Sequence, residues 1–355
     1  MSKTFLAINF GCRVNAAETN QWSQTFIEQG FVPTKNKPDI IFVNTCAITK
    51  KGEKESLSKI RILQKQYPKA KIIVSGCANF SKLSNVDIVK NREKEEKLKK
   101  LESFYSQKIG DKYTPYKRFM LKVQSGCTQN CSYCIVPQKR PYHFSLPISD
   151  AIKTIKKIEN DYDEIIITGV NLNQYQYGFS NLIEKILKET KIKLISFGSI
   201  PLNCIDDKFL KLIKNYKLRI KNFFHIPIQS GSDHILKLMH RPYDREKIIK
   251  TFTSLREVKR RSNPDGIATS ANWRTRDDTI DFGTDIIVGF PTETKKDFQD
   301  TLDICKQIGF KKIHTFRYSP RPDTEAKDLF ESSPKITKEE LKSRSVKIRN
   351  AIRTS

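Results

Sequence analysis

Three cysteines, Cys127, Cys131 and Cys134, lie within one short loop of the sequence. Thiolates at this spacing can hold three corners of a cubic iron–sulfur cluster and leave the fourth iron without a protein ligand. Such an open iron can bind S-adenosylmethionine and deliver one electron to its sulfonium, which cleaves the molecule to a radical. The alternative is a structural zinc site, which normally needs four ligands; no fourth is adjacent, although His143 could serve. Tyr133, directly before the last cysteine, favours the iron–sulfur interpretation.

Three further cysteines each follow a predicted strand. Cys12, Cys46 and Cys77 come after the apolar runs at 4–10, 40–43 and 71–75. Helical segments at 16–29 and 48–67, and a Lys/Glu-rich run to residue 105, separate and follow these strands, and this βαβαβα order predicts a parallel sheet. Because parallel strands end at the same edge of a sheet, we expect the three cysteines to converge there. The alternative is that they are small buried residues at strand ends.

A second series of strands begins at the three-cysteine loop. Apolar runs occur at 119–123, 164–168, 193–197, 223–228, 284–288 and 312–318, with helical periodicity between most of them. Six such units predict a partial (β/α)6 TIM-like barrel, in which the active site lies at the carboxyl ends of the strands. The predicted fold class is therefore α/β, with a parallel-sheet domain followed by a barrel.

Composition shifts divide the chain into four predicted regions. Residues 1–105 form the first domain, 106–117 a linker, 118–330 the barrel and 331–355 a basic C-terminal helix. A long polar stretch at 262–280 precedes the fifth predicted strand of the barrel. We expect a surface insertion there, although its Trp273 beside Arg274 could instead stack on a base.

The charge balance favours a polyanionic partner. The 355 residues include 65 Lys and Arg against 39 Asp and Glu, a net charge of +26. Such an excess is typical of nucleic-acid binding, although a lysine-rich proteome would produce it too. We find no apolar stretch long enough to span a membrane and no export signal, so we expect a cytoplasmic protein. Of the 8 cysteines, Cys204 and Cys305 stand alone and are expected to pack in the core.

Seven ordered motifs resemble the methylthiotransferase family of the radical S-adenosylmethionine superfamily. They are GCRVN at 11–15, VNTC at 43–46, SGC at 75–77, CSYCIVP at 131–137, TGVN at 168–171, HIPIQSGS at 225–232 and DIIVGFPTET at 285–294. The resemblance runs from Lys3 to about Ala326. It implies two [4Fe-4S] clusters, one on each set of three cysteines. The first would generate a radical from S-adenosylmethionine, and the second would carry the sulfur, which a further S-adenosylmethionine methylates.

The resemblance also implies a substrate and partners. Members of the family act on adenosine 37 of tRNA, bearing either a threonylcarbamoyl or an isopentenyl group, or on an aspartate of a ribosomal protein. The motifs around Cys12 and Cys46 are most similar to the threonylcarbamoyladenosine branch, and the isopentenyl branch is the alternative. The implied partners are the tRNA anticodon stem-loop, a sulfur donor, and a one-electron donor such as flavodoxin or ferredoxin. A non-catalytic, metal-containing RNA-binding protein is the alternative of a different class.

Residues beside the predicted strand ends are candidates for binding S-adenosylmethionine. They are Tyr133, Thr168, Gly169, Asn171, Gln229, Ser230, Val288 and Gly289. Gly169 resembles the segment of the superfamily that receives the methionyl amino group, because a glycine lets the backbone approach the ligand. Gln229 and Ser230 could contact the ribose or carboxylate, and Val288 with Gly289 could pack against the adenine. The alternative is that these are ordinary barrel turns.

Four arginines are candidates for contact with RNA, and the chain differs from the family in two places. Arg140, Arg241, Arg317 and Arg321 are predicted to contact phosphates near the rim. The five histidines show no ligand spacing, and His225 is expected in the barrel wall. Family members usually end in a small RNA-binding β-barrel, which is not seen before Ser355, and Pro141 stands where the family tends to have glycine.

Overall fold

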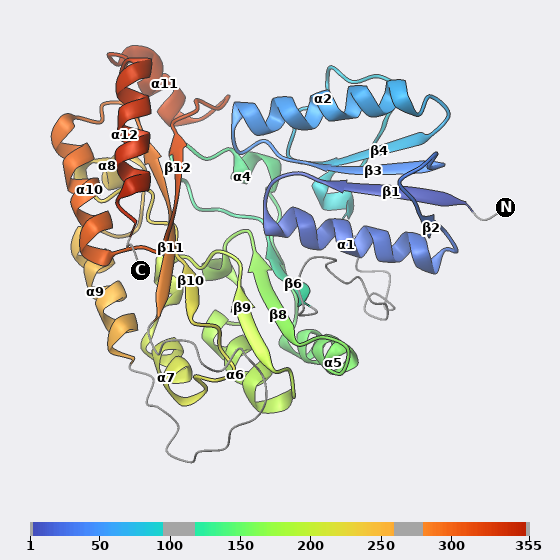
Figure 1. Cartoon of the computed structure of the whole chain (residues 1–355), viewed down its shortest axis with the longest axis horizontal. Coiled ribbons are helices and arrows are strands. Elements are labelled where there is room, and N and C mark those ends of the chain that lie inside the picture. Colours follow the sequence, from blue (N-terminus) through green and yellow to red (C-terminus); the bar gives the residue numbers. More distant parts are fainter. Residues whose placement is uncertain (1–2, 95–117, 259–279, 353–355) are drawn as a thin grey trace.

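Helix α1 lies between two groups of parallel strands (Figure 1). The computed structural model describes residues 3–94, 118–258 and 280–352. The N-terminal sheet has the order β2-β1-β3-β4-β5, with all neighbouring strands parallel. Its strands are β1 (Thr4–Asn9), β2 (Val32–Pro33), β3 (Ile40–Thr45), β4 (Lys71–Gly76) and β5 (Asp87–Ile88).

Two helices, α1 (Arg13–Glu28) and α2 (Lys50–Gln66), cover opposite faces of this sheet (Figure 1). Side chains alternate between the two faces of a strand, and β3 follows this rule on both sides. Phe42 stacks on Trp22 of α1, with ring centroids 5.0 Å apart. Ile41 and Val43 point the other way, into the cluster that contains Ile60 of α2. This double burial explains why β3 has a continuous apolar run.

The second group of strands forms an open barrel. Its parallel strands are β6 (Arg118–Ser125), β8 (Glu164–Gly169), β9 (Leu194–Phe197), β10 (Phe223–His225), β11 (Asp281–Val288) and β12 (Lys312–Arg317), and the short β7 (Phe144–Ser145) pairs antiparallel with β6. Isolated bridges from Ile195 to Ile220 and from Ser199 to His225 join β9 to the β10 side. Within residues 118–258 and 280–352, β12 pairs only with β11, and β6 only with β7 and β8, so the barrel does not close.

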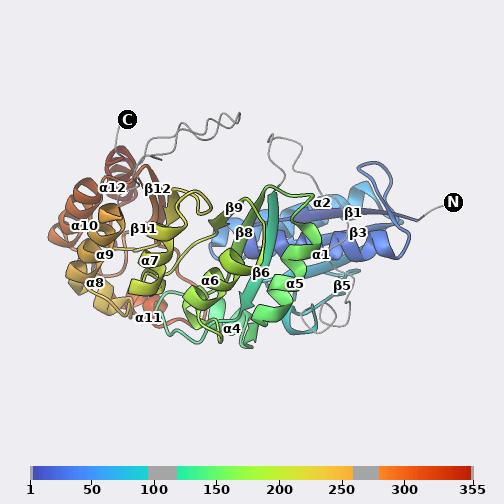
Figure 2. The same cartoon turned by 90° about the horizontal axis from the view of Figure 1, so that it is seen from below.

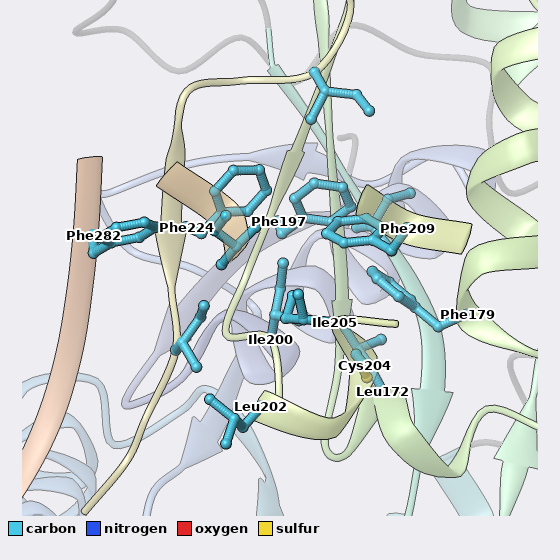
Figure 3. Close-up of a cluster of buried hydrophobic side chains, with 14 of the residues drawn as sticks. Leu172, Phe179, Phe197, Ile200, Leu202, Cys204, Ile205, Phe209, Phe224 and Phe282 are labelled. Atoms are coloured by element: carbon cyan, nitrogen blue, oxygen red, sulfur yellow. The ribbon is translucent and has the colours of Figure 1, made fainter. Parts of the chain in front are cut away.

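Helices cover the outside of the barrel (Figure 2). They are α4 (Val136–Lys139), α5 (Ile148–Ile158), α6 (Phe179–Glu189), α7 (Asp207–Asn215), α8 (Asp233–Leu238), α9 (Arg245–Glu257), α10 (Lys295–Ile308), α11 (Glu325–Ser332) and α12 (Lys338–Asn350), with 3-10 turns η1 (Leu172–Gln174) and η2 (Leu202–Cys204). Aromatic rings fill the layer between strands and helices, where Phe197 and Phe224 of the strands meet Phe209 of α7 (Figure 3). Cys204 and Cys305 are buried in this core.

The predicted fold class is confirmed, with two differences in detail. The two-residue strands β2, β5 and β7 are too short to leave a periodic signal in the sequence. Helix α12 packs against β11, β12 and α10, so the basic C-terminal segment belongs to the outer layer of the barrel rather than forming a separate region. The predicted linker at 106–117 and nearly all of the insertion at 262–280 lie outside the described residues. Among the described helices, none is both long and apolar enough to cross a membrane.

Candidate iron–sulfur sites

The loop that carries Cys127, Cys131 and Cys134 begins where β6 ends. Gly126 starts it with φ +88°, and a Cβ there would lie 1.6 Å from the carbonyl oxygen of Tyr142. Only glycine can therefore make this turn without moving the neighbouring backbone. The N–H of Cys134 donates to the carbonyl of Cys131 at 3.0 Å, which closes a tight turn between two of the three thiols.

Other parts of the barrel rim hold this loop in place. The hydroxyl of Ser132 donates to the carbonyl of Leu238 at 2.6 Å, at the end of α8. The carbonyl of Ser132 accepts from the N–H of Ala326 at 2.9 Å, in α11. The N–H of Thr128 donates to the Gln174 side chain at 3.0 Å, in η1. The loop is thus fixed by rim segments that are far apart in the sequence, which suits a site that must hold a ligand rigidly.

Two polar side chains approach the sulfur atoms. Nδ2 of Asn171 lies 3.4 Å from Sγ of Cys127, and Nη1 of Arg241 lies 3.5 Å from Sγ of Cys131. Burial raises the pKa of the Cys131 thiol, and the Arg241 guanidinium partly opposes this increase. Burial also raises the pKa of Cys134, to about 12. Hydrogen bonds and positive charge beside the sulfurs favour the thiolate form that an iron–sulfur cluster requires.

The donor atoms around the three-cysteine loop fit a cluster better than a single zinc ion. Zinc holds each thiolate at about 2.3 Å, which would place tetrahedral sulfur ligands about 3.8 Å apart. Among the described residues, neither cysteine set forms a group with all ligand atoms within 4.8 Å of one another, and His143 completes no such group. The three-thiolate donor set without a fourth protein ligand therefore fits a [4Fe-4S] cluster with one open iron.

The second set of cysteines lies at the carboxyl edge of the N-terminal sheet. Cys12, Cys46 and Cys77 follow β1, β3 and β4 in that order. The N–H of Cys77 donates to the Thr45 carbonyl at 3.1 Å, and Gly11 brings its backbone so close that a Cβ would lie 2.7 Å from the Cys46 sulfur. The structure thus brings these three cysteines together as the sheet topology predicts.

Burial controls the acidity of this second set. The pKa of the Cys46 thiol is raised to about 11. Burial is the main cause, the neighbouring Cys12 and Cys77 contribute to the increase, and Arg321 opposes it. Burial also raises the pKa of Cys12, against the opposing charge of Arg140. The free thiols of Cys12 and Cys46 therefore stay protonated at neutral pH, so binding of a metal cluster must displace their protons.

A buried group of charges joins the N-terminal domain to the barrel. Glu18 of α1 is fully buried and accepts from Arg140 at 2.7 and 3.0 Å. Lys122 of β6 lies 3.2 Å from the same carboxylate, and Lys94 also pairs with it. Burial acts to raise the pKa of Glu18, but the three cations outweigh it and hold that pKa well below its usual range. The prediction that Arg140 contacts phosphate is therefore wrong, because its guanidinium is committed to this network.

A second contact joins the two parts at the rim. Arg321 is buried and pairs with Glu53 of α2, so its predicted role in phosphate binding is also wrong. The hydroxyl of Ser319 accepts from the N–H of Lys50 at 3.3 Å in the same region. Arg241 lies beside Cys131 instead of facing solvent, whereas Arg317 is exposed and stays a candidate for phosphate contact.

Most of the predicted S-adenosylmethionine contacts lie at the rim of the barrel. Thr168 and Gly169 end β8, and Asn171 follows them and reaches Cys127. Gln229 follows β10 with φ +70°, and Gly289 follows β11 with φ +72°. Two residues with positive φ, Gln229 and Gly289, thus lie at the same rim of the barrel as the three-cysteine loop.

Three other predicted contacts have different surroundings. The Ser230 hydroxyl is buried and bonded to Thr301 of α10 at 3.1 Å, and the Val288 side chain is buried in the main core beneath the helices. Both side chains are thus buried toward the helix layer, and their predicted contacts with the cofactor stay predictions. The ring of Tyr133 packs edge-on against the ring of Phe290, with the ring centroids 6.5 Å apart, and this contact supports the cysteine loop.

Sequence reasoning missed Gln124, which positions two parts of this site at once. Its Oε1 accepts from the N–H of Asn171 at 2.7 Å, and its Nε2 donates to the carbonyl of Gly126 at 2.7 Å. Gln124 is fully buried, and a buried polar side chain in a strand is informative because it needs partners. The only sequence signal was an amide near the carboxyl end of a predicted strand.

Comparison with protein families and curated proteins agrees with this site. The chain matches the radical SAM superfamily over residues 121–305 and the uncharacterized protein family UPF0004 over residues 4–104. It is 31% identical to the threonylcarbamoyladenosine tRNA methylthiotransferase MtaB of Aquifex aeolicus, over 93% of this chain and 84% of that protein. It is 32% identical to the tRNA-2-methylthio-N(6)-dimethylallyladenosine synthase of Thermodesulfovibrio yellowstonii, over 90% of this chain and 77% of that protein.

Solved structures share the fold at low sequence identity. The radical S-adenosylmethionine methyltransferase TsrM from Kitasatospora setae superposes with a TM-score of 0.62 at 12% identity, over 92% of this chain and 77% of TsrM. The cobalamin-dependent S-adenosylmethionine radical enzyme OxsB superposes with a TM-score of 0.54 at 13% identity, over 98% of this chain and 56% of OxsB. Together with the sequence matches, this places the chain in the methylthiotransferase family of radical S-adenosylmethionine enzymes, whose cofactors are [4Fe-4S] clusters and S-adenosylmethionine.

Proposed function

We propose that this enzyme adds a methylthio group to C2 of N6-threonylcarbamoyladenosine at position 37 of tRNA. The observation that carries the proposal is the presence of two three-cysteine sites, one at the rim of the barrel and one at the edge of the docked N-terminal sheet. One site can generate a radical and the other can supply sulfur. The net charge of +26 supports a polyanionic substrate.

The residues of the chain divide the work between the two sites. When bound, the clusters supply one-electron cleavage of S-adenosylmethionine and the sulfur that is transferred. Cys127, Cys131 and Cys134 would hold the radical-generating cluster, with Asn171 and Arg241 donating toward the sulfurs. Cys12, Cys46 and Cys77 would hold the sulfur-carrying cluster. A one-electron donor, such as flavodoxin or ferredoxin, and a sulfur donor complete the proposed reaction.

The choice of the threonylcarbamoyl branch rests on the motif at 11–15. Relatives named for either tRNA substrate are about 30% identical to this chain, so overall identity does not distinguish the two branches. They differ in the residues just after the first cysteine, where this chain has Arg13. The Arg13 guanidinium reaches across to the barrel and donates to the Phe197 carbonyl at 2.6 Å, at the end of β9. Arg13 of this motif thus contacts the carboxyl end of a barrel strand, which supports a role in specificity.

Nucleoside analysis of tRNA tests this proposal. In a strain that lacks the gene, mass spectrometry should show loss of the methylthio form of threonylcarbamoyladenosine and accumulation of the form without the methylthio group. The methylthio form of isopentenyladenosine serves as the control and should persist. Persistence of the threonylcarbamoyl product together with loss of the isopentenyl product would instead establish the alternative branch.

A further inference from the structure

Two histidines and an aspartate meet on the inner face of the barrel, on three adjacent strands. His225 ends β10, Asp285 lies in β11 and His314 lies in β12. The register pairs Asp285 with His314, and His225 with Gly283, two residues before Asp285 on the same face. Their neighbours Phe224, Ile286 and Ile313 are buried in the core beneath the helices, so the three polar side chains point to the opposite side.

The ligating atoms of this cluster are close together. Nε2 of His225 lies 2.9 Å from Oδ1 of Asp285, and Nδ1 of His314 lies 3.2 Å from the same oxygen. One ligand atom from each residue can be chosen so that all three lie within 4.8 Å of one another. Bonds of about 2.0–2.2 Å to a tetrahedral ion place neighbouring ligand atoms about 3.3 Å apart. The two distances to the Asp285 oxygen, 2.9 and 3.2 Å, lie within a few tenths of an ångström of this separation.

The backbone holds the cluster in this arrangement. A Cβ on Gly283 would lie 2.7 Å from Nδ1 of His225, so the absence of a side chain there leaves space for the imidazole ring. The carbonyl of Asp285 accepts from the N–H of Gln229 at 2.9 Å, which fixes β11 beside the segment after β10. Three ligands on rigid, hydrogen-bonded strands lose little entropy when an ion binds.

The cluster is also accessible. The exposed fractions of the side chains are 11% for His225, 21% for Asp285 and 46% for His314. An ion bound by these three residues would keep coordination positions toward the inner face, available to water or to an oxygen donor of a substrate. Three protein ligands with an open position are typical of reactive rather than structural metal sites, and two histidines with one carboxylate suit divalent zinc or iron.

We propose that His225, Asp285 and His314 form a third metal site, which binds one divalent first-row transition-metal ion independently of the cysteines. Another histidine–aspartate pair shows the contrast. His234 lies 3.1 Å from Asp297, but that carboxylate also accepts from Ser232 and Thr294 and completes the cap of α10. Asp297 therefore has a structural use, whereas Asp285 is bonded by two imidazoles that can themselves serve as ligands.

Zinc binding by the reconstituted enzyme tests the proposal. The protein with its clusters assembled is dialysed against Zn²⁺ and then against metal-free buffer, and zinc and iron are counted by elemental mass spectrometry. We expect about one retained zinc ion per chain, and loss of at least three quarters of it in His314→Gln and in Asp285→Asn, with iron unchanged. His234→Gln is the matched control and should retain the zinc.

The substitutions make the result decisive. His314 is partly exposed, so its replacement leaves the core intact, and an unchanged iron content shows that the variant has folded. Equal zinc in the wild-type enzyme and His314→Gln would overturn the proposal, as would a wild-type enzyme that retains no zinc. Loss of zinc in His234→Gln to the same extent would also overturn it, because the ion would then bind elsewhere.

Discussion

Glu18 and Arg140 form a buried ion pair although they are 122 residues apart in the chain, with Nη1 of the arginine 2.7 Å from Oε1 of the glutamate. Glu18 lies in α1, which begins directly after Cys12, and Arg140 follows the loop of the other three cysteines. Lys94 and Lys122 share the same carboxylate, so three cations surround one anion. The excess positive charge lies near Cys12, where Arg140 lowers the thiol pKa against burial. The network thus fixes both cysteine sites and favours anionic sulfur beside it.

The Glu18→Gln variant should be much less stable than the wild type. Removing one partner of a buried ion pair leaves uncompensated charge, which costs about 3–5 kcal/mol. Because the pKa of Glu18 is held well below its usual range, this stabilisation is present at neutral pH and is lost only as the pH falls through the lowered pKa. Urea unfolding at pH 7.5 measures the loss. Glu55→Gln is the control, because Glu55 is exposed and lies 3.8 Å from Lys51, and equal effects of the two substitutions would contradict this prediction.

The Gly126→Ala variant should lose one cluster and keep the other. A Cβ at Gly126 would collide with the Tyr142 carbonyl at 1.6 Å, so the loop of Cys127 must move. We expect iron to fall from about eight to about four ions per chain, as measured by iron and sulfide analysis after anaerobic reconstitution. Gly30→Ala is the control, because Gly30 also has a positive φ, +83°, but has open space around it. An iron content that stays at the wild-type value in Gly126→Ala would show that the loop tolerates the shift.

The Cys12→Ala variant should separate the two halves of the reaction. It removes a ligand of the N-terminal site and leaves the loop of Cys127 intact. We therefore expect 5′-deoxyadenosine formation from S-adenosylmethionine to continue at a rate within about threefold of the wild type, and methylthio product to fall below detection. Liquid chromatography of both products measures this separation. Loss of cleavage in Cys12→Ala would mean that the roles of the two sites have been assigned wrongly.

The thiol of Cys46 should be almost unreactive in the cluster-free protein at pH 8. With a pKa of about 11, only about one thiol in a thousand is ionised at that pH, and the thiolate is the reactive form. Alkylation by iodoacetamide should accelerate about tenfold for each pH unit up to that value. Peptide mass spectrometry at several pH values measures the rate, with the same protein unfolded in guanidinium as the control. Equal rates in the folded and unfolded protein at pH 8 would contradict the raised pKa.

Much of this architecture could be predicted because it depends on local rules. Cys46 follows an apolar strand, and the common edge of parallel strands is enough to bring it near Cys12 and Cys77. The partners of Arg140 could not be predicted in this way. Its position after the cysteine loop indicated an exposed rim residue, whereas its ion pair depends on how α1 packs on β6, which no local pattern records.

The histidine cluster shows the same limit. His225 and His314 are 89 positions apart, and their common contact with Asp285 depends on the register of three strands. A one-residue change of register would place the side chains on opposite faces. The surroundings of Ser230 and Val288 could not be predicted for a related reason: a residue near a strand end can face either layer, and only the packing of the helices decides which.

Helix α1 has two buried sides, since it packs on β1 and β3 of one sheet and on β6 and β8 of the other (Figure 1). A hinge between the two cysteine-bearing parts would have to pull Glu18 away from Lys122 and Arg140 and break both of these buried ion pairs. The N-terminal sheet therefore cannot swing toward a substrate as a mobile arm. Under the proposed function, sulfur is therefore delivered while the two cysteine sites keep a fixed separation.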